Sequence, residues 1–129
     1  MYHVLECATF EVHVFCSSKD DFSFESQVMN YLKTHHDMGD KAIKGVRAVL
    51  RRFAELGQNG LTREAFHEVD RDEKIWEFSK GDHRIFCFLI GKAVVLTNAA
   101  MKKGQKVDPA EVKKAISARA IYQQFRGSK

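Results

Sequence analysis

The sequence predicts an α+β fold with an N-terminal strand, a helical hairpin, a three-stranded antiparallel meander and a C-terminal helix. The spacing of the apolar residues along the chain supports this order. Apolar residues recur at helical spacing over residues 24–57, whereas residues 74–98 hold three β-rich runs with very short breaks between them. With 129 residues, no repeat and no linker rich in Pro, Gly or Ser, the chain is expected to form one domain over residues 1–129.

The first half contains the predicted strand and hairpin. Residues 9–15 (TFEVHVF) alternate and are rich in β-formers, which is typical of a strand. A first helix is expected from the possible N-cap Ser23 to Gly39, and Asp40 then caps a second helix that Gly57 ends. The apolar stripe of the two helices consists of Phe24, Val28, Tyr31, Leu32, Ile43, Val46, Val49, Leu50, Phe53 and Leu56.

The second half is expected to be a meander, because breaks this short allow only antiparallel hairpins. If Lys80 and Gly81 form the first turn, Glu77 lies opposite Arg84. Alternation then places Arg84, Phe86, Phe88 and Ile90 on one face, and His83, Ile85, Cys87 and Leu89 on the other. The three strands are predicted at residues 74–78, 83–90 and 92–98.

A final helix is predicted from about Pro109 to Phe125. Asp108 is a capping residue, Pro109 suits the first helical position, and Glu111 completes a capping box. The apolar residues of this helix point in two directions, so we expect its distal half to lie against a partner.

The composition excludes several classes. No apolar run approaches the roughly 20 residues of a membrane span, and the N-terminus lacks the basic region of a signal peptide. Three cysteines without CxxC spacing argue against a disulfide framework or a cysteine zinc site, and they favour a cytoplasmic protein.

Charge is distributed unevenly along the chain, whose formal net charge is +4. Residues 41–63 hold six basic and one acidic residue, and residues 101–129 hold eight basic and two acidic residues. Residues 1–40 and 64–82 are instead rich in acids. This segregation indicates a basic face for a polyanion, although scattered solubilising charge would also explain it.

Several kinds of chemistry find no support in the sequence. There is no Gly-rich phosphate loop and no paired-carboxylate motif. His35, His36 and Asp37 lie near Asp40, but adjacent residues on a helix point apart, so no metal site and no cofactor are predicted. Cys87 lies in the middle of a strand, where a buried and inert thiol is expected.

Three basic elements remain: Arg84, the loop at residues 102–106, and the helix containing Arg51. Arg84 opens an otherwise apolar strand, so its guanidinium needs a partner. A cross-strand ion pair with Glu77 would supply one, and a phosphate bound by the guanidinium would supply another. The two interpretations are compatible if Glu77 orients Arg84.

The order of elements, with IWEF (Ile75–Phe78), HRIFCF (His83–Phe88) and VVL–NAAMKKGQK (Val94–Lys106), resembles the RelE/HigB-type toxins of bacterial toxin–antitoxin pairs, in particular their phage-associated HigB-like branch. The resemblance implies a RelE-like fold and a toxin that cleaves messenger RNA on the ribosome without a metal. It also implies two partners, a cognate antitoxin of helix-turn-helix type and ribosome-bound mRNA, and no membrane.

The resemblance also implies roles for single residues. Arg84 matches the family's central arginine, and Lys102 and Lys103 match its basic active-site loop; these are the catalytic candidates. Gln105 and Lys106 match the loop more weakly and are candidates for RNA binding. The basic residues Lys80 and Arg51 are added as RNA-binding candidates from the sequence itself, and so is Glu77 as the residue that orients Arg84. The chain departs from the branch at Ser79, where an arginine is common, and at Asn98 and Ala100, where His and Phe are common.

The residues leave the general base open. A lysine would need a lowered pKa, His83 is expected to face away from Arg84, and His67 can contribute only if its loop folds over the sheet. Two other functions also remain open: inhibition of DNA gyrase in the manner of ParE-type toxins, and an inactive homologue that binds RNA or antitoxin.

Overall fold

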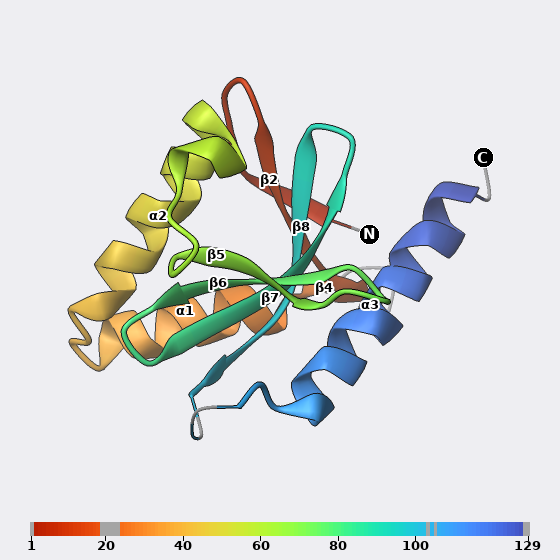
Figure 1. Cartoon of the computed structure of the whole chain (residues 1–129). Coiled ribbons are helices and arrows are strands. Elements are labelled where there is room, and N and C mark those ends of the chain that lie inside the picture. The colour runs from red at the N-terminus through yellow and green to blue at the C-terminus, as the bar shows by residue number, and fades with distance from the viewer. Residues whose placement is uncertain (1, 19–23, 103, 105, 128–129) are drawn as a thin grey trace.

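The computed structural model describes residues 2–18, 24–102, 104 and 106–127. Its ribbon shows a twisted sheet with helices on both faces (Figure 1). The elements are β1 (Tyr2–Cys7), β2 (Glu11–Phe15), β3 (Ser17–Ser18), β4 (Phe24–Glu25), α1 (Gln27–Asp37), α2 (Ala42–Leu56), the 3₁₀ turn η1 (Gln58–Gly60), β5 (Phe66–Asp70), β6 (Ile75–Lys80), β7 (His83–Ile90), β8 (Ala93–Met101) and α3 (Pro109–Gly127).

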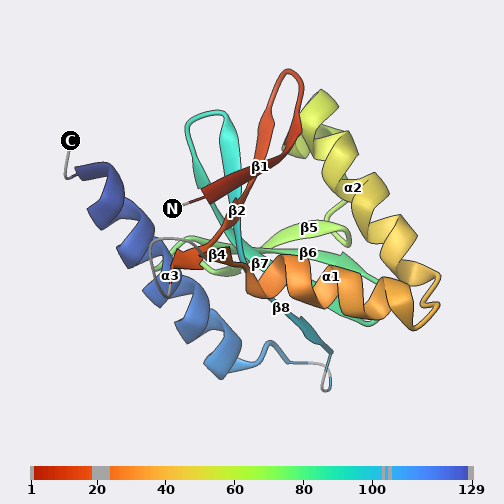
Figure 2. The same ribbon diagram turned by 180° about the vertical axis from the view of Figure 1, so that it is seen from behind.

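The main sheet has six strands in the order β1-β2-β8-β7-β6-β5. Strand β2 pairs with β8 in parallel, and the other neighbours pair antiparallel. The α+β class and the antiparallel β6–β7–β8 strands are confirmed. The predicted count was too low, because β5 extends the meander and β1 forms a hairpin with β2 (Figure 2).

The predicted first turn of the meander was wrong by one position. Lys80 pairs with His83, so the turn residues are Gly81 and Asp82, and Arg84 lies opposite Ser79. Gly81 has φ of 58°, a backbone conformation that glycine adopts without strain. The correction makes Glu77 a diagonal neighbour of Arg84 on the same face of the sheet.

Two apolar layers enclose the sheet. Helices α1 and α2 pack on one face through Val28, Leu32, Ile43, Val46, Leu50 and Phe53, against sheet residues that include Ile85, Cys87 and Leu96. Helix α3 packs on the other face, against residues that include Phe86, Phe88 and Val95. The predicted alternation along β7 is therefore confirmed, because consecutive residues of this strand pack into opposite layers.

The start of α1 differs from the prediction. Ser26 is the N-cap, and its Oγ accepts a hydrogen bond from the backbone N–H of Met29 at 3.1 Å. Phe24 belongs to β4, which pairs with β3, and not to the helix. The predicted cap Ser23 lies outside the described residues. The N-cap position of α2 is Lys41, whose side chain makes no cap bond. The predicted cap Asp40 lies one residue earlier and supplies the bond instead, because its Oδ1 accepts from the N–H of Ala42 at 2.9 Å.

Helix α3 has a more regular inner face than the sequence suggested. Val112, Ala115, Ala118 and Tyr122 are buried against the sheet, and the ring of Tyr122 packs against Phe88. Small alanine side chains, which the sequence interpretation passed over, let the helix lie close to the strands. Ile121 points outward and is 47% exposed. Among the described residues, no helix is long and apolar enough to cross a membrane.

Candidate functional site

A pocket of about 160 Å³ opens where the ends of several strands meet the first turn of α3. Its lining residues come from the α3 face of the sheet, from the end of β8 and from the first turn of α3. The ribbon shows that α3 follows β8 on this face (Figure 1). Both strands of the β6–β7 hairpin contribute to the pocket, and so do β5 and the end of β8. Its lining consists of His67, Glu77, Ser79, Arg84, Phe86, Ala100, Met101, Lys102, Gly104, Lys106, Val107, Asp108 and Glu111.

Arg84 is held in place by its own hairpin. Its Nη1 donates hydrogen bonds to the carbonyl oxygens of Gly81, at 2.7 Å, and His83, at 3.0 Å. Its Nε lies 3.3 Å from Oε1 of Glu77. Among the described residues, Nη2 forms no hydrogen bond. The guanidinium is thus fixed on two sides and can offer donors to a ligand.

Glu77 is a buried carboxylate at the base of the pocket, with a side chain 5% exposed. Burial raises its pKa, and the positive charges of His67, Arg84 and Lys102 oppose this shift without cancelling it. The carboxylate is therefore a stronger base than an exposed glutamate would be. A group of this kind lining a pocket is a candidate for proton transfer.

His67 lies beside Glu77 because β5 pairs with β6, which places the two residues opposite each other. Its Nδ1 lies 2.9 Å from the carbonyl oxygen of Arg63. A carbonyl can only accept, so Nδ1 carries a proton. Nε2 then faces Oε1 of Glu77 at 3.4 Å. That contact is favourable only if a second proton sits on His67 or on Glu77, so the two groups form an acid–base pair.

The lysine loop is only partly described. Lys102 and Lys106 both line the pocket, and the backbone N–H of Lys102 donates to the carbonyl oxygen of Asp82 at 2.7 Å. This bond ties the end of β8 to the turn that also holds Arg84. Lys103 and Gln105 lie outside the described residues, so the roles expected for them stay predictions.

Two predicted RNA-binding residues lie elsewhere. Lys80 follows Ser79 in β6 and points to the opposite face, where its side chain lies against Gly45 of α2. Arg51 is exposed on α2, whose packed side contacts that same face. The pocket therefore brings together Arg84, Glu77, Lys102 and Lys106, but not Lys80 or Arg51.

Glu111 also lines the pocket, which its sequence context did not predict. The structure likewise explains the asparagine at position 98. Asn98 is buried, and its Nδ2 donates to the backbone oxygen and to Oε1 of Glu111. Lys114 contacts the other carboxylate oxygen of Glu111 at 2.7 Å. These bonds fix the first turn of α3 against β8. The capping pattern Asp108–Glu111 was the only signal in the sequence, and it indicated a helix start without a pocket.

A known protein family covers the part of the chain that holds the pocket. A family model described as phage derived protein Gp49-like (DUF891) matches residues 36–120, about two thirds of the chain. The matched region runs from the end of α1 into α3 and contains every described residue of the pocket lining. A search of curated proteins finds no match.

Proposed function

The chain belongs to the Gp49-like family of phage-derived proteins, a RelE/toxin-like family, and from this premise we propose that it is a toxin that cleaves messenger RNA on the ribosome. One observation carries the proposal: a single pocket combines Arg84 and two lysines with a buried carboxylate and a histidine. Cleavage of RNA by its own 2′-OH needs these kinds of group and no others.

The cations suit the phosphate. In the transition state the phosphorus is bonded to five oxygens and carries extra negative charge. Arg84 stays protonated at any physiological pH, and its backbone hydrogen bonds to Gly81 and His83 prevent it from moving away. Fixed donors of this kind stabilise developing charge because they need not reorganise during the reaction. Lys102 and Lys106 extend the positive surface along the RNA backbone.

The proton transfers fit the pair Glu77 and His67. Glu77 accepts the proton of the 2′-OH as the bond between 2′-oxygen and phosphorus forms. His67, protonated at both nitrogens, gives a proton to the 5′-oxygen as the bond between phosphorus and that oxygen breaks. The products are a 2′,3′-cyclic phosphate and a 5′-hydroxyl end. Transfer of the proton from Glu77 to His67, which are in contact, restores the starting state.

The chain's own side chains supply each of these roles, so the proposed reaction is metal-independent. The ribosome would hold the message in a bent conformation that aligns the 2′-oxygen with the phosphorus, which a small open pocket does not enforce. We therefore expect weak activity on free RNA. Cleavage should act mainly on ribosome-bound message in the cytoplasm.

We also propose a cognate antitoxin as the protein partner. A groove of about 430 Å³ runs along α3. It starts at the first turn of this helix, the same turn that contributes Glu111 to the pocket. Ala110, Ala118 and the exposed Ile121 make it apolar, and Lys113 and Lys114 give it positive charge. An acidic amphipathic segment suits such a surface and would cover the pocket entrance from there.

Expression in a bacterial host tests the function. Induction should arrest growth and protein synthesis and produce new ends in translated messages, while chromosomal DNA stays intact. Co-expression of the adjacent reading frame should relieve the arrest. DNA damage with intact messages would indicate gyrase inhibition instead, and growth without arrest would contradict the proposed toxicity.

Lys106→Ala should weaken RNA binding with little effect on the cleavage rate of bound message. Loss of one phosphate contact should reduce the slope of log Kd against log salt concentration by about 0.7 for single-stranded RNA. The measurement is binding at several salt concentrations. Lys44→Ala is the matched control, since Lys44 is an exposed lysine on α2, across the sheet from the pocket. Equal slopes for the two variants would show that Lys106 does not contact an RNA phosphate.

A further inference from the structure

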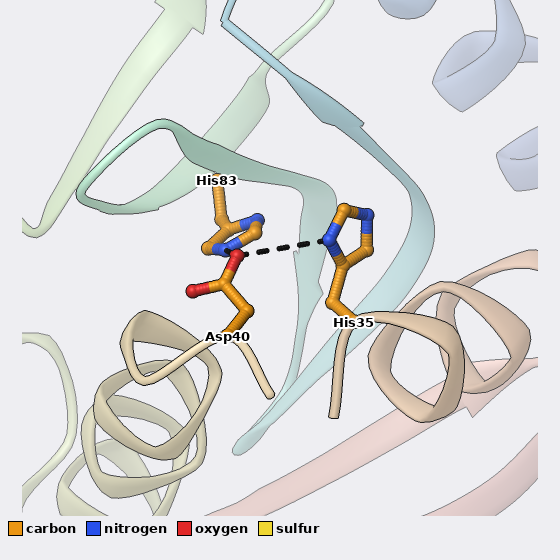
Figure 3. A group of neighbouring side chains, drawn as sticks. All are labelled: His35, Asp40 and His83. Atoms are coloured by element: carbon orange, nitrogen blue, oxygen red, sulfur yellow. Dashed lines mark hydrogen bonds and ion pairs between the residues drawn. The ribbon is translucent and has the colours of Figure 1, made fainter. Parts of the chain in front are cut away.

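A second cluster of side chains lies on the other face of the sheet, between α1, α2 and β7. It consists of His35 from α1, Asp40 from the connection between the helices, and His83 from β7 (Figure 3). Each offers one ligand atom, and these atoms all lie within 4.8 Å of one another. We propose that this cluster is a binding site for a zinc-class transition-metal ion.

The two distances from Asp40 are close to those of a tetrahedral site, and the third pair of ligand atoms lies within 4.8 Å. Zinc bonds of about 2.0–2.1 Å at tetrahedral angles put neighbouring ligand atoms about 3.4 Å apart. Oδ2 of Asp40 lies 2.8 Å from Nε2 of His83 and 3.7 Å from Nδ1 of His35. Shifts of well under 1 Å at these two contacts would give the tetrahedral spacing. Figure 3 shows the carboxylate between the two rings, with all three side chains pointing to one centre.

Each ligand is already oriented by its surroundings. His83 is 2% exposed, and its Nδ1 lies 2.6 Å from the hydroxyl of Tyr31. The ring of His35 packs against both Tyr31 and His83, with ring centres 4.2 and 4.9 Å away. Oδ1 of Asp40 is used in capping α2, which directs Oδ2 to the histidines. Such outer contacts fix a metal ligand's orientation and tautomer.

A hydrogen-bond partner for the second ring nitrogen of His83 is already in place, because the hydroxyl of Tyr31 lies 2.6 Å from Nδ1. That hydroxyl can donate to Nδ1 of His83 or accept from it. When a metal takes Nε2, the proton of His83 can therefore move to Nδ1 and keep a partner.

The donor set identifies the class of ion. Two imidazole nitrogens and one carboxylate suit Zn²⁺, or Co²⁺ as its spectroscopic substitute, whereas Mg²⁺ and Ca²⁺ prefer oxygen ligands. The side chains of Asp40 and His35 are 30% and 16% exposed, so a water molecule can complete the coordination from the solvent side. The ion would join α1, the α1–α2 connection and β7. It would not reach the pocket, because His83 and Arg84 point to opposite faces.

Local spacing predicted no metal site here, since on α1 the neighbours of His35 are His36 and Asp37. Their side chains do diverge on the helix, and the side chain of His36 is 68% exposed. The third ligand comes from a strand far along the chain, which no local spacing reveals. This arrangement provides a matched pair of variants, one histidine inside the cluster and one beside it.

The test is a titration with Zn²⁺ in competition with a chromophoric chelator, followed by Co²⁺ absorption spectra. All proteins carry Cys7→Ser, because Cys7 is exposed and could bind zinc itself. The background protein and His36→Ala should bind one Zn²⁺ per chain with equal affinity and show the intense visible bands of tetrahedral Co²⁺. His35→Ala and Asp40→Asn, which keeps a side-chain cap for α2, should bind at least 10- to 100-fold more weakly, about the loss seen for outer contacts alone.

Circular dichroism confirms that each variant is folded before titration. Binding by His35→Ala within about threefold of His36→Ala would overturn the proposal. So would equal losses in both histidine variants, which would indicate weak binding at the helix surface, or the absence of saturable binding to the background protein. None of these outcomes depends on RNA cleavage, so the metal site and the proposed function are tested separately.

Discussion

Replacing Arg84 by alanine is expected to slow cleavage of ribosome-bound message by about 100- to 1000-fold, the usual effect of removing one fixed donor to a transition-state charge. RNA binding should change little, because Lys102 and Lys106 remain and because the contact strengthens only as the phosphate gains charge. Single-turnover cleavage and RNA binding of the variant and the parent protein measure the two effects.

Arg84→Ala also removes one of the two side chains that pair with the Glu77 carboxylate, Arg84 and His67. A thermal unfolding curve is therefore needed for each preparation, and Arg84→Lys serves as the second variant. Lysine keeps the positive charge but cannot reproduce the pair of hydrogen bonds to Gly81 and His83. It should fall between the parent and the alanine variant. Cleavage by folded Arg84→Ala at the parent's rate would remove the arginine from the mechanism.

Glu77→Gln should have the larger effect on cleavage, a loss of about 100- to 10,000-fold, if the carboxylate is the general base. Glutamine has the same shape and can still accept a hydrogen bond from Arg84, so it separates proton transfer from orientation. A loss below tenfold would mean that Glu77 only orients Arg84. The pH profile gives an independent readout, because the parent's rate should fall as Glu77 becomes protonated, and the variant should lack this acid limb.

Glu77→Gln should lower the cleavage rate but raise the stability of the folded chain relative to the parent as the pH increases. Burial makes the pKa of Glu77 higher in the folded chain than in the unfolded chain, so the folded state holds this proton more tightly. The stability that follows is present below the unfolded-state pKa, near the ordinary value of 4.5, and is lost as the pH rises through the folded-state pKa. The Tm of Glu77→Gln minus that of the parent should therefore be more positive at pH 8 than at pH 4. A difference that falls with pH would contradict the assignment.

Most of the fold could be predicted because the spacing of apolar residues is regular within α1, α2 and β7. The helical stripes of α1 and α2 and the alternation along β7 are local patterns, and most of their residues packed as expected. The exceptions are Phe24, which lies in β4, and Leu56, which is 52% exposed. Strand β5 (FHEVD) was missed because it is short and polar, with two acids among its five residues. It is a strand because β6 offers a free edge, which is a property of the sheet and not of the segment.

The sequence predicted a site residue only where a charged side chain stood out from its neighbours in the chain. Arg84 at the head of an apolar strand indicated a bound partner, and the lysine loop indicated an anion. His67 carries no such signal in its sequence, since its place beside Glu77 depends on the pairing of β5 with β6. His35 and His83 likewise come together only through the packing of α1 on β7. Contacts between distant segments are set by tertiary structure, which local spacing does not encode.

The central claim is that this pocket cleaves RNA by attack of the 2′-oxygen, and the ends left on the message test it most directly. Purified protein is added to ribosomes stalled on a defined message, and the new termini are identified chemically. We predict 5′-hydroxyl ends paired with 2′,3′-cyclic phosphates, or the 3′-phosphates formed by their hydrolysis, and none of these ends with Glu77→Gln on the same time scale. Ends carrying 5′-phosphate and 3′-hydroxyl, or equal cleavage by Glu77→Gln, would contradict the account.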